Sequence, residues 1–424
     1  MVGWPVVAAA IVAGLVEMTL LAVWQRNGYW DFSDGVYALS ARELLHGLSP
    51  YRDFAAAQPP PVFVFGALLL AVHDGIVALR AGLALIDLAT AGLVGVCVWR
   101  MSRRTWLALA AASIAPLLPI SLHEHAQLTP ETLAAALIMA GALCCSRRGG
   151  ASWGAALLAL AVACKLAFAV PALAVAMVSP SRRRAMGGLI GWGVILGALS
   201  LAVFGTGVWR EAVEAQLQVG RASAHYVGGL LAQGAWNEFP LVIGASAAVC
   251  FAATGDARVG DPALLRTLTA AACGALVIAL SVVKRGSYIN VLVVAEPPLL
   301  SLAVCGAAWS VDRWRQSRVL IGALATLLAA QSLSLLVSPQ DPWAAKRPLA
   351  RSGLAWSAGP AAIRSAVAAA RRCPERAAYS GTPYVAFLAA RRLPGEQPDL
   401  FMLRYAADDA RFAQRAARDQ PRCP

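Results

Sequence analysis

The side chains best suited to chemistry lie in a polar segment between two apolar stretches near the start of the chain. Residues 29–61 read YWDFSDGVYALSARELLHGLSPYRDFAAAQPPP. The candidates in this segment are Asp31, Asp34, Arg52, Asp53 and Gln58. A carboxylate can take a proton from a hydroxyl group, and an arginine can hold a phosphate through two parallel hydrogen bonds. The segment therefore has the residue types for acid–base chemistry beside an anionic group.

Polar side chains also interrupt three later apolar stretches. They are His123, His125 and Glu131 in SLHEHAQLTPE, Lys165 in ALAVACKLAFAVP, and Lys284, Arg285, Tyr288 and Asn290 in KRGSYIN. Charges at membrane depth are costly, so they are functional candidates by default, and the cations among them can hold phosphate. His123 and His125 favour hydrogen-bonding or acid–base roles over a metal pair, and no residue set has the pattern of a zinc site.

The composition says which elements must position these residues. Hydrophobic residues make up 59% of the 424 residues and charged residues only 14%. Apolar runs recur at about the 20-residue length that a membrane-spanning helix needs, and a bilayer excludes open sheet edges. We predict an all-α polytopic membrane protein surrounded by membrane lipids. The net charge of +13 lies mostly in clusters between apolar runs, as the positive-inside rule describes, so it does not indicate a nucleic-acid partner.

Hydropathy and the basic clusters together predict about eleven transmembrane helices. They lie at about residues 4–25, 77–99, 105–121, 130–145, two within 152–179, 186–204, 238–254, 267–283, 288–308 and 319–337. Basic residues flank both ends of 152–179, so two short helices with Lys165 at the turn keep both clusters on one side. In this topology the chain starts inside, and the candidate residues all meet at the outer face.

Two further predictions concern regions outside the spans. Residues 35–47 and 59–72 are expected to form juxtamembrane helices on the outer surface, because the second run is too short to span. The chain is expected to divide into a transmembrane catalytic domain, 1–337, and a small extracytoplasmic C-terminal region, 338–424. In that compartment Cys373 and Cys423 could form a disulfide.

Several candidates also have a purely structural reading. Asp34 is well placed to cap the helix GVYALSARELL, since Asp accepts backbone N–H bonds at that position. Lys165 could snorkel to a membrane interface. KRGSYIN could be an ordinary outer loop. The residue pattern leaves these alternatives open.

The run D-x-x-D-G-V-Y-A-L-S-A-R-E-L-L-H-G-L-S-P-Y-R-D-F, followed by Q-P-P-P, resembles the first outer loop of the GT-C superfamily. These polytopic glycosyltransferases use polyprenyl-phosphate sugars and include protein O-mannosyltransferases, aminoarabinose transferases and actinobacterial mannosyltransferases. The Lys165 turn resembles the family's short helix pair with an outward Lys, and KRGSYIN resembles a K-x-G-S-x-x-N stretch. Many relatives have an acidic pair before G-x-Y, where this chain has Ser33 and Asp34. The resemblance covers about residues 1–340.

This resemblance implies an inverting transfer of a sugar from a polyprenyl-phosphate donor to an acceptor hydroxyl. Asp34 matches the family's base by position, with Asp31 as the second candidate. Lys165, Lys284, Arg285 and Arg52 would hold the leaving phosphate. No cofactor is implied, since the donor arrives activated. The sugar, mannose or another hexose or pentose, and the acceptor, a lipid, glycan or protein, stay open. The expected location is a bacterial inner membrane, with the active site facing outside.

Two other classes of function compete with a transferase. A transporter or lipid flippase would also place charges within spans, although such proteins often show repeat symmetry between their halves, which this sequence lacks. A non-catalytic membrane scaffold derived from a glycosyltransferase would keep the fold and lose the chemistry. Replacement of Asp34 by Asn separates an enzyme from a scaffold.

Overall fold

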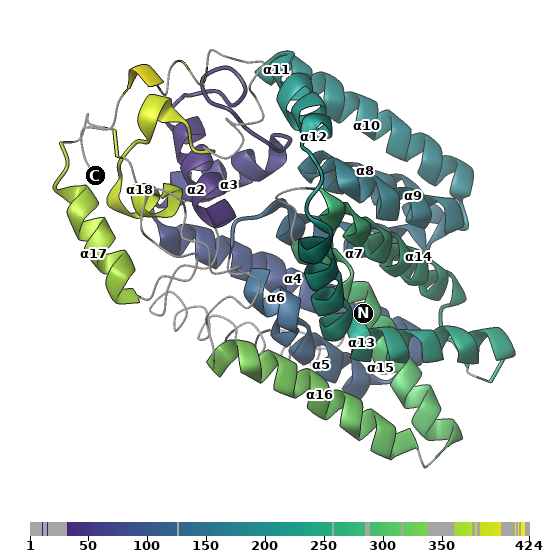
Figure 1. The fold of residues 1–424 in the computed structure, drawn as a ribbon. Coiled ribbons are helices and arrows are strands. Elements are labelled where there is room, and N and C mark those ends of the chain that lie inside the picture. Colours follow the sequence, from purple (N-terminus) through teal and green to yellow (C-terminus); the bar gives the residue numbers. More distant parts are fainter. Residues whose placement is uncertain are drawn as a thin grey trace.

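The computed structural model describes residues 32–124, 127–256, 258–284, 289–314, 317–337, 360–374, 378–379 and 382–399, with a few single positions near the two ends. The elements in these ranges are helices, apart from two isolated β-bridges. Long helices lie side by side, and the short helices α2, α3, α17 and α18 gather at one end of them (Figure 1). The structure confirms the predicted all-α class.

Four helices among the described residues are long and apolar enough to cross a membrane. They are α4 (Ile76–Ser102), α10 (Arg182–Phe204), α13 (Ala224–Thr254), and α14 (Pro262–Ile278) continued by a 3-10 turn to Val283. Each contains or nearly matches one predicted span. The helix α13 starts earlier than predicted, because the side chain of Ser223 accepts a hydrogen bond from the Tyr226 amide and so caps it.

The other predicted spans that fall within the described residues also form helices. They correspond to α5 (Thr105–Ile114), α6 (Pro119–Glu124), α7 (Pro130–Cys145), α8 (Ala151–Cys164), α9 (Ala169–Val178), α15 (Glu296–Arg313) and α16 (Ser317–Val337). The first predicted span, residues 4–25, falls almost wholly outside the described residues. The total of about eleven spans therefore stays a prediction.

The predicted turn at Lys165 is confirmed by hydrogen bonds at the opposite end of the helix pair. The hydroxyl of Ser179, just after α9, donates to the Cys145 carbonyl at 2.8 Å, and Ser181 donates to the Arg148 carbonyl at 3.3 Å. The chain leaving α9 thus returns to the segment that precedes α8. Lys165 lies at the tip of this hairpin, where its extended backbone separates the two helices.

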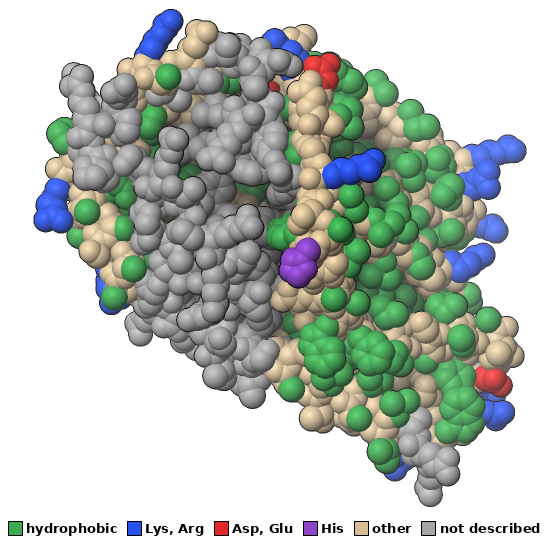
Figure 2. Space-filling view, viewed as in Figure 1, with side chains coloured by type: hydrophobic (Ala, Val, Ile, Leu, Met, Phe, Trp, Pro, Cys, Tyr) green, Lys and Arg blue, Asp and Glu red, His purple; other side chains and the backbone are tan. Residues whose placement is uncertain are grey.

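The basic clusters collect at the end of the bundle away from Lys165. Arg104 pairs with Asp312 at 2.6 Å, and Arg100 pairs with Asp261. Arginines 182–184 are exposed where α10 begins. In Figure 2 several Lys and Arg side chains project from the right edge, and hydrophobic side chains cover much of the surface beside it. Only 6% of the most apolar window of α10 is buried inside the protein, as suits a helix in contact with lipid.

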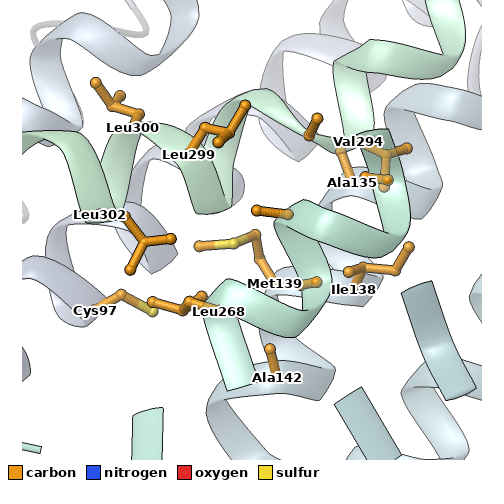
Figure 3. Close-up of a cluster of buried hydrophobic side chains, with 14 of the residues drawn as sticks. Cys97, Ala135, Ile138, Met139, Ala142, Leu268, Val294, Leu299, Leu300 and Leu302 are labelled. Carbon is orange, nitrogen blue, oxygen red and sulfur yellow. The ribbon is translucent and has the colours of Figure 1, made fainter. Parts of the chain in front are cut away.

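The interior is packed by small and branched side chains. Met139 of α7 lies among Cys97 of α4, Leu268 of α14 and Leu302 of α15 (Figure 3). The helices α13 and α15 approach so closely that a Cβ atom on Gly306 would lie 2.1 Å from the Gly244 carbonyl oxygen. Small residues at helix crossings permit this approach inside a membrane.

The short helices at the other end bring the first loop and the C-terminal region together. Here α2 (Phe32–Leu45) and α3 (Pro61–Val72) match the two predicted juxtamembrane helices, while α17 (Pro360–Arg371) and α18 (Pro383–Ala389) come from the C-terminal region. Leu39 of α2 shares a hydrophobic cluster with Ile363, Val367 and Tyr384. We call α2, α3, α17, α18 and the segments between them the outer layer.

Candidate functional site

Asp34 is the centre of a buried hydrogen-bond set that joins three elements. Its two carboxylate oxygens accept from the Arg80 guanidinium of α4, at 3.0 and 2.5 Å, and Oδ1 also accepts from the Leu128 amide at 2.9 Å. The residue is 2% exposed. These bonds of the carboxylate thus go to other elements instead of capping its own helix. They fix Asp34 in one orientation, through charge-assisted bonds of the strong, two-point kind.

Glu131 and Lys165 form a second ion pair at the same end of the bundle. Lys165 Nζ lies 2.5 Å from Glu131 Oε1. The glutamate is 1% exposed, whereas the lysine side chain is 23% exposed. The second oxygen of Glu131 has no hydrogen-bond partner in the described part of the chain. Lys165 therefore faces an acid at the protein's interior, and one oxygen of that acid can still accept a hydrogen bond.

Lys284 lies near this pair, although it comes from a different part of the sequence. Its amine bonds to Gln216 Oε1. Burial, together with the nearby charge of Lys165, lowers the pKa of Lys284 to about 8. The two lysines are thus close enough to repel one another. Such a pair gains stability when an anion binds between them or beside them.

The loop between α10 and α13 holds Lys284 and the first loop in place. The Ala222 amide donates to the Val283 carbonyl at 2.8 Å. Gln216 Nε2 donates to the Ala57 carbonyl at 3.0 Å, and Glu211 Oε2 accepts from the Ala56 amide at 2.7 Å. Glu211 lies in a π-helical turn, a feature frequent at functional sites. These contacts connect the lysines to the outer layer.

Three predicted residues of the first loop build that loop. Asp53 accepts from the Ser49 amide at 2.7 Å and from Arg52 at 3.0 Å, which closes a turn. Gln58 contributes its backbone carbonyl to the Tyr51 hydroxyl at 2.5 Å. These bonds of Asp53 and Gln58 stay within the first loop, and the Arg52 side chain is exposed.

Most of the remaining predicted residues lie outside the described part of the chain. Asp31, His125, Arg285 and Tyr288 lie outside the described residues, as does the side chain of His123. Asn290 is half-buried in a 3-10 turn that precedes α15. Their roles stay predictions. Among the residues that can be searched, no three His, Cys, Asp or Glu side chains lie together as a metal site would require.

Three acidic side chains meet at one short segment, residues 119–131. Two of them, from other elements, accept hydrogen bonds from its backbone, and the third belongs to the segment itself. Glu296 at the start of α15 accepts from the Ile120 and Ser121 amides at 3.0 and 2.7 Å, and from the Ser121 hydroxyl. Asp34 accepts from Leu128, and Glu131 closes the segment with Lys165. The sequence alone indicates that Glu296 pairs internally or marks a cavity; the structure shows that it holds this segment.

Two residues that sequence analysis missed complete the surroundings of Asp34. They are Arg80, which lies just after the first turn of the apolar helix α4, and Tyr384, which lies in the C-terminal region and hydrogen-bonds Arg80. In the sequence Arg80 resembles an ordinary interfacial anchor, and the pattern around Tyr384 carries no recognisable motif. The one available signal is Arg80 itself, one of two charged residues, with Asp87, in the apolar stretch VALRAGLALIDLA.

Comparison with known proteins identifies the fold. No protein-family model matches the chain, and no curated protein matches it. The crystal structure of ArnT from Cupriavidus metallidurans bound to undecaprenyl phosphate is similar, with a TM-score of 0.63 and 15% sequence identity over 97% of this chain and 88% of ArnT. The apo structure of ArnT is similar too, with a TM-score of 0.63, 14% identity and coverage of 96% and 88%. The chain therefore shares the fold of ArnT.

Proposed function

We propose that this protein is an integral membrane glycosyltransferase that moves a sugar from a polyprenyl-phosphate donor to an acceptor hydroxyl. The observation that carries the proposal is the meeting of Lys165, Lys284 and Glu131 at one end of the bundle. The fold supports it as well, because ArnT, which shares this fold, has a crystal structure with bound undecaprenyl phosphate. Of the possible donors, a lipid-linked phosphate sugar fits both observations.

The two lysines are the proposed binding site for the donor phosphate. Cations aimed at a leaving phosphate stabilise the negative charge that develops as the sugar departs. A bound phosphate also favours the charged form of Lys284, which burial and Lys165 disfavour in its absence. Glu131 fixes Lys165, and its second oxygen can accept a hydrogen bond from a sugar or acceptor hydroxyl.

Asp34 is the proposed base. In the transfer step the acceptor hydroxyl gives its proton to the Asp34 carboxylate, and the acceptor oxygen attacks the anomeric carbon from the face opposite the phosphate. The bond from the anomeric carbon to the phosphate oxygen breaks, its electron pair stays on that oxygen, and the sugar inverts. Arg80 and the Leu128 amide hold the carboxylate still. Because Asp34 is buried, the acceptor must enter between the side chains that cover it.

One observation favours the scaffold alternative. Asp34 already accepts three hydrogen bonds, two from Arg80 and one from the Leu128 amide, as the acid of a purely structural ion pair would. A scaffold needs only the pair's geometry, whereas an enzyme needs the charge of the carboxylate.

The experiment that separates them uses purified protein in nanodiscs. Short-chain polyprenyl-phosphate mannose, arabinose and glucose are supplied in turn, and release of free polyprenyl phosphate is measured. Asp34→Asn is compared with Asp312→Asn, which alters an ion-paired aspartate at the opposite end. We expect one donor to be consumed, a loss of at least about 100-fold for Asp34→Asn, and near wild-type release for Asp312→Asn. Folded protein that releases nothing from any donor contradicts the proposal.

We also propose an orientation in a bacterial inner membrane. The end of the bundle with Lys165 and Lys284 faces outside, and the end with the arginine clusters, the basic end, faces the cytoplasm. The support is the collection of arginines at the basic end, since cytoplasmic loops carry the excess of Lys and Arg. Single cysteines placed at Arg183 and at Arg52 should differ in labelling by a membrane-impermeant maleimide on intact cells, with only the second one reacting.

A further inference from the structure

Tyr384 is held in one position by the start of α18. The Thr382 side chain accepts from the Val385 amide at 3.3 Å and caps the helix, and Pro383 occupies its first turn. Proline is favoured there because its missing N–H is not needed. Tyr384 is the next residue and is buried. The local structure at the start of α18 therefore fixes the backbone of Tyr384.

The start of α18 lies directly against the helix that carries Asp34. A Cβ atom on Gly35 would lie 2.3 Å from the Tyr384 amide nitrogen and 2.6 Å from its Cα atom. The approach is possible only because residue 35 has no side chain. The neighbouring Arg42 donates to the Phe387 carbonyl at 2.6 Å and stacks over its ring at 3.9 Å. α18 thus contacts α2 at Tyr384 and again about one turn later at Phe387.

Arg80 connects Tyr384 to Asp34. Its guanidinium donates two hydrogen bonds to the Asp34 oxygens, and it also bonds to the Tyr384 side chain. Arginine only donates, so the phenol oxygen is the acceptor. Burial raises the pKa of Tyr384, which keeps the phenol neutral at physiological pH. Arg80 is itself buried, so a hydrogen bond lost there has no water to replace it.

We propose that Tyr384 is a positioning residue for Asp34: by holding the third side of the Arg80 guanidinium, it fixes the plane in which Arg80 presents its two donors to the carboxylate. The C-terminal region is then part of the active centre. This inference rests on the proposed function, because it takes Asp34 as the base.

The test compares Tyr384→Phe with Tyr379→Phe. Both replace a buried tyrosine of the C-terminal region, but the contacts of Tyr379 in the described structure lie within that region and its cluster instead of at Arg80 or Asp34. We expect Tyr384→Phe to lower kcat about tenfold and to leave the KM for the donor within about twofold, while Tyr379→Phe keeps both. A role in stability alone would lower Tm and reduce kcat only by the unfolded fraction, which would overturn the proposal. An active Tyr384→Phe beside an inactive Asp34→Asn overturns it too, and leaves the proposed function intact.

A second measurement does not depend on activity. Thermal unfolding of Tyr384→Phe, Asp34→Asn and the double variant forms a double-mutant cycle. Both residues bond to the same guanidinium, so we expect the Tm shift of the double variant to be smaller than the sum of the single shifts by at least a few degrees. The same cycle with Tyr379→Phe should be additive. Additive shifts in both cycles contradict the proposed link between Tyr384 and Asp34, even if no donor has been found.

Discussion

The two ends of the helical bundle use charge in different ways. At the basic end, arginines stand on the surface, and the Arg104 and Asp312 side chains of one pair are 39% and 47% exposed. At the other end the pairs Asp34–Arg80 and Glu131–Lys165 bury their acids almost completely. A surface pair contributes little to stability, whereas a buried pair must overcome a large desolvation cost. The difference agrees with the proposal that the first end anchors the protein and that the second end carries the site of sugar transfer.

Arg100 and Asp261 are an instructive intermediate case. They lie at the basic end but are mostly covered. Asp261 also accepts from the Leu264 amide at 2.9 Å and so caps α14. A buried pair at this end therefore has a clear local structural task. Neither Asp34 nor Glu131 accepts such a bond from its own helix in the described structure.

The largest expected effect comes from removing one partner of a buried pair, compared with removing one partner of an exposed pair. Arg80→Met leaves the Asp34 carboxylate buried without its counter-charge, which costs about 3–5 kcal/mol of unfolding free energy. Arg104→Met removes an exposed partner, and we expect a cost of about 0–1 kcal/mol. Thermal unfolding in one detergent measures both variants. Equal Tm shifts would show that the two ends do not differ in this way.

A smaller effect should come from the lysines. Lys284 has a pKa of about 8, and the anion binds its protonated form, so affinity for polyprenyl phosphate should fall as the pH rises through and above 8. Binding itself favours the proton, which moves the decline above the value in the free protein. We expect about tenfold weaker binding at pH 9.5 than at pH 7.

Calorimetric titration at several pH values measures this decline. Lys284→Met should bind more weakly at pH 7 and lose most of the pH dependence between 7 and 9.5. Arg318→Met, which removes an exposed cation far from this pair, is the control. A wild-type affinity that stays constant over this range would contradict the proposed role of Lys284.

The smallest expected effect concerns the contact between α2 and the C-terminal region. Burial and the nearby Glu396 raise the pKa of Glu43 to about 7, against an opposing effect of Arg42 and Arg392. The docked state therefore favours the protonated acid. Its stability is full below the ordinary value of 4.5, is lost as the pH rises toward 7, and stays low above it.

Hydrogen exchange of residues 383–389 reports on this contact. We expect severalfold faster exchange, relative to the rest of the protein, at pH 8 than at pH 5.5 after correction for intrinsic rates. Glu43→Gln, which imitates the protonated acid, should exchange slowly at both values. Wild-type and variant profiles that agree at both pH values would show that Glu43 does not control the contact.

The sequence predicts structure correctly where a charged residue and its neighbours along the chain decide the arrangement. Lys165 interrupts an apolar run flanked by arginines, so a hairpin was the arrangement that kept both basic clusters on one side, and hydrogen bonds from Ser179 and Ser181 confirm it. Asp34, Glu131 and Lys284 were found because a charge beside apolar helices is costly. Their catalytic and binding roles stay predictions.

The partners of these residues could not be predicted in the same way. Arg80 lies 46 residues from Asp34, and nothing in the sequence of either helix specifies that they meet. Tyr384 is further away still along the chain, in a region for which the sequence predicts only a small C-terminal region. Such pairings depend on how helices pack, and the close approach that permits one of them is set by the missing side chain of Gly35.

The segment 119–131 has a consequence for how this protein can vary. It connects the point where Glu296 is bound to the points where Asp34 and Glu131 are bound. An extended chain gains at most about 3.3–3.6 Å for each added residue. The number of residues between Ser121 and Leu128 therefore limits the distance at which the three acids can be held from one another. Substitutions within this stretch leave that limit unchanged, whereas a single insertion or deletion changes it by up to the length of one extended residue.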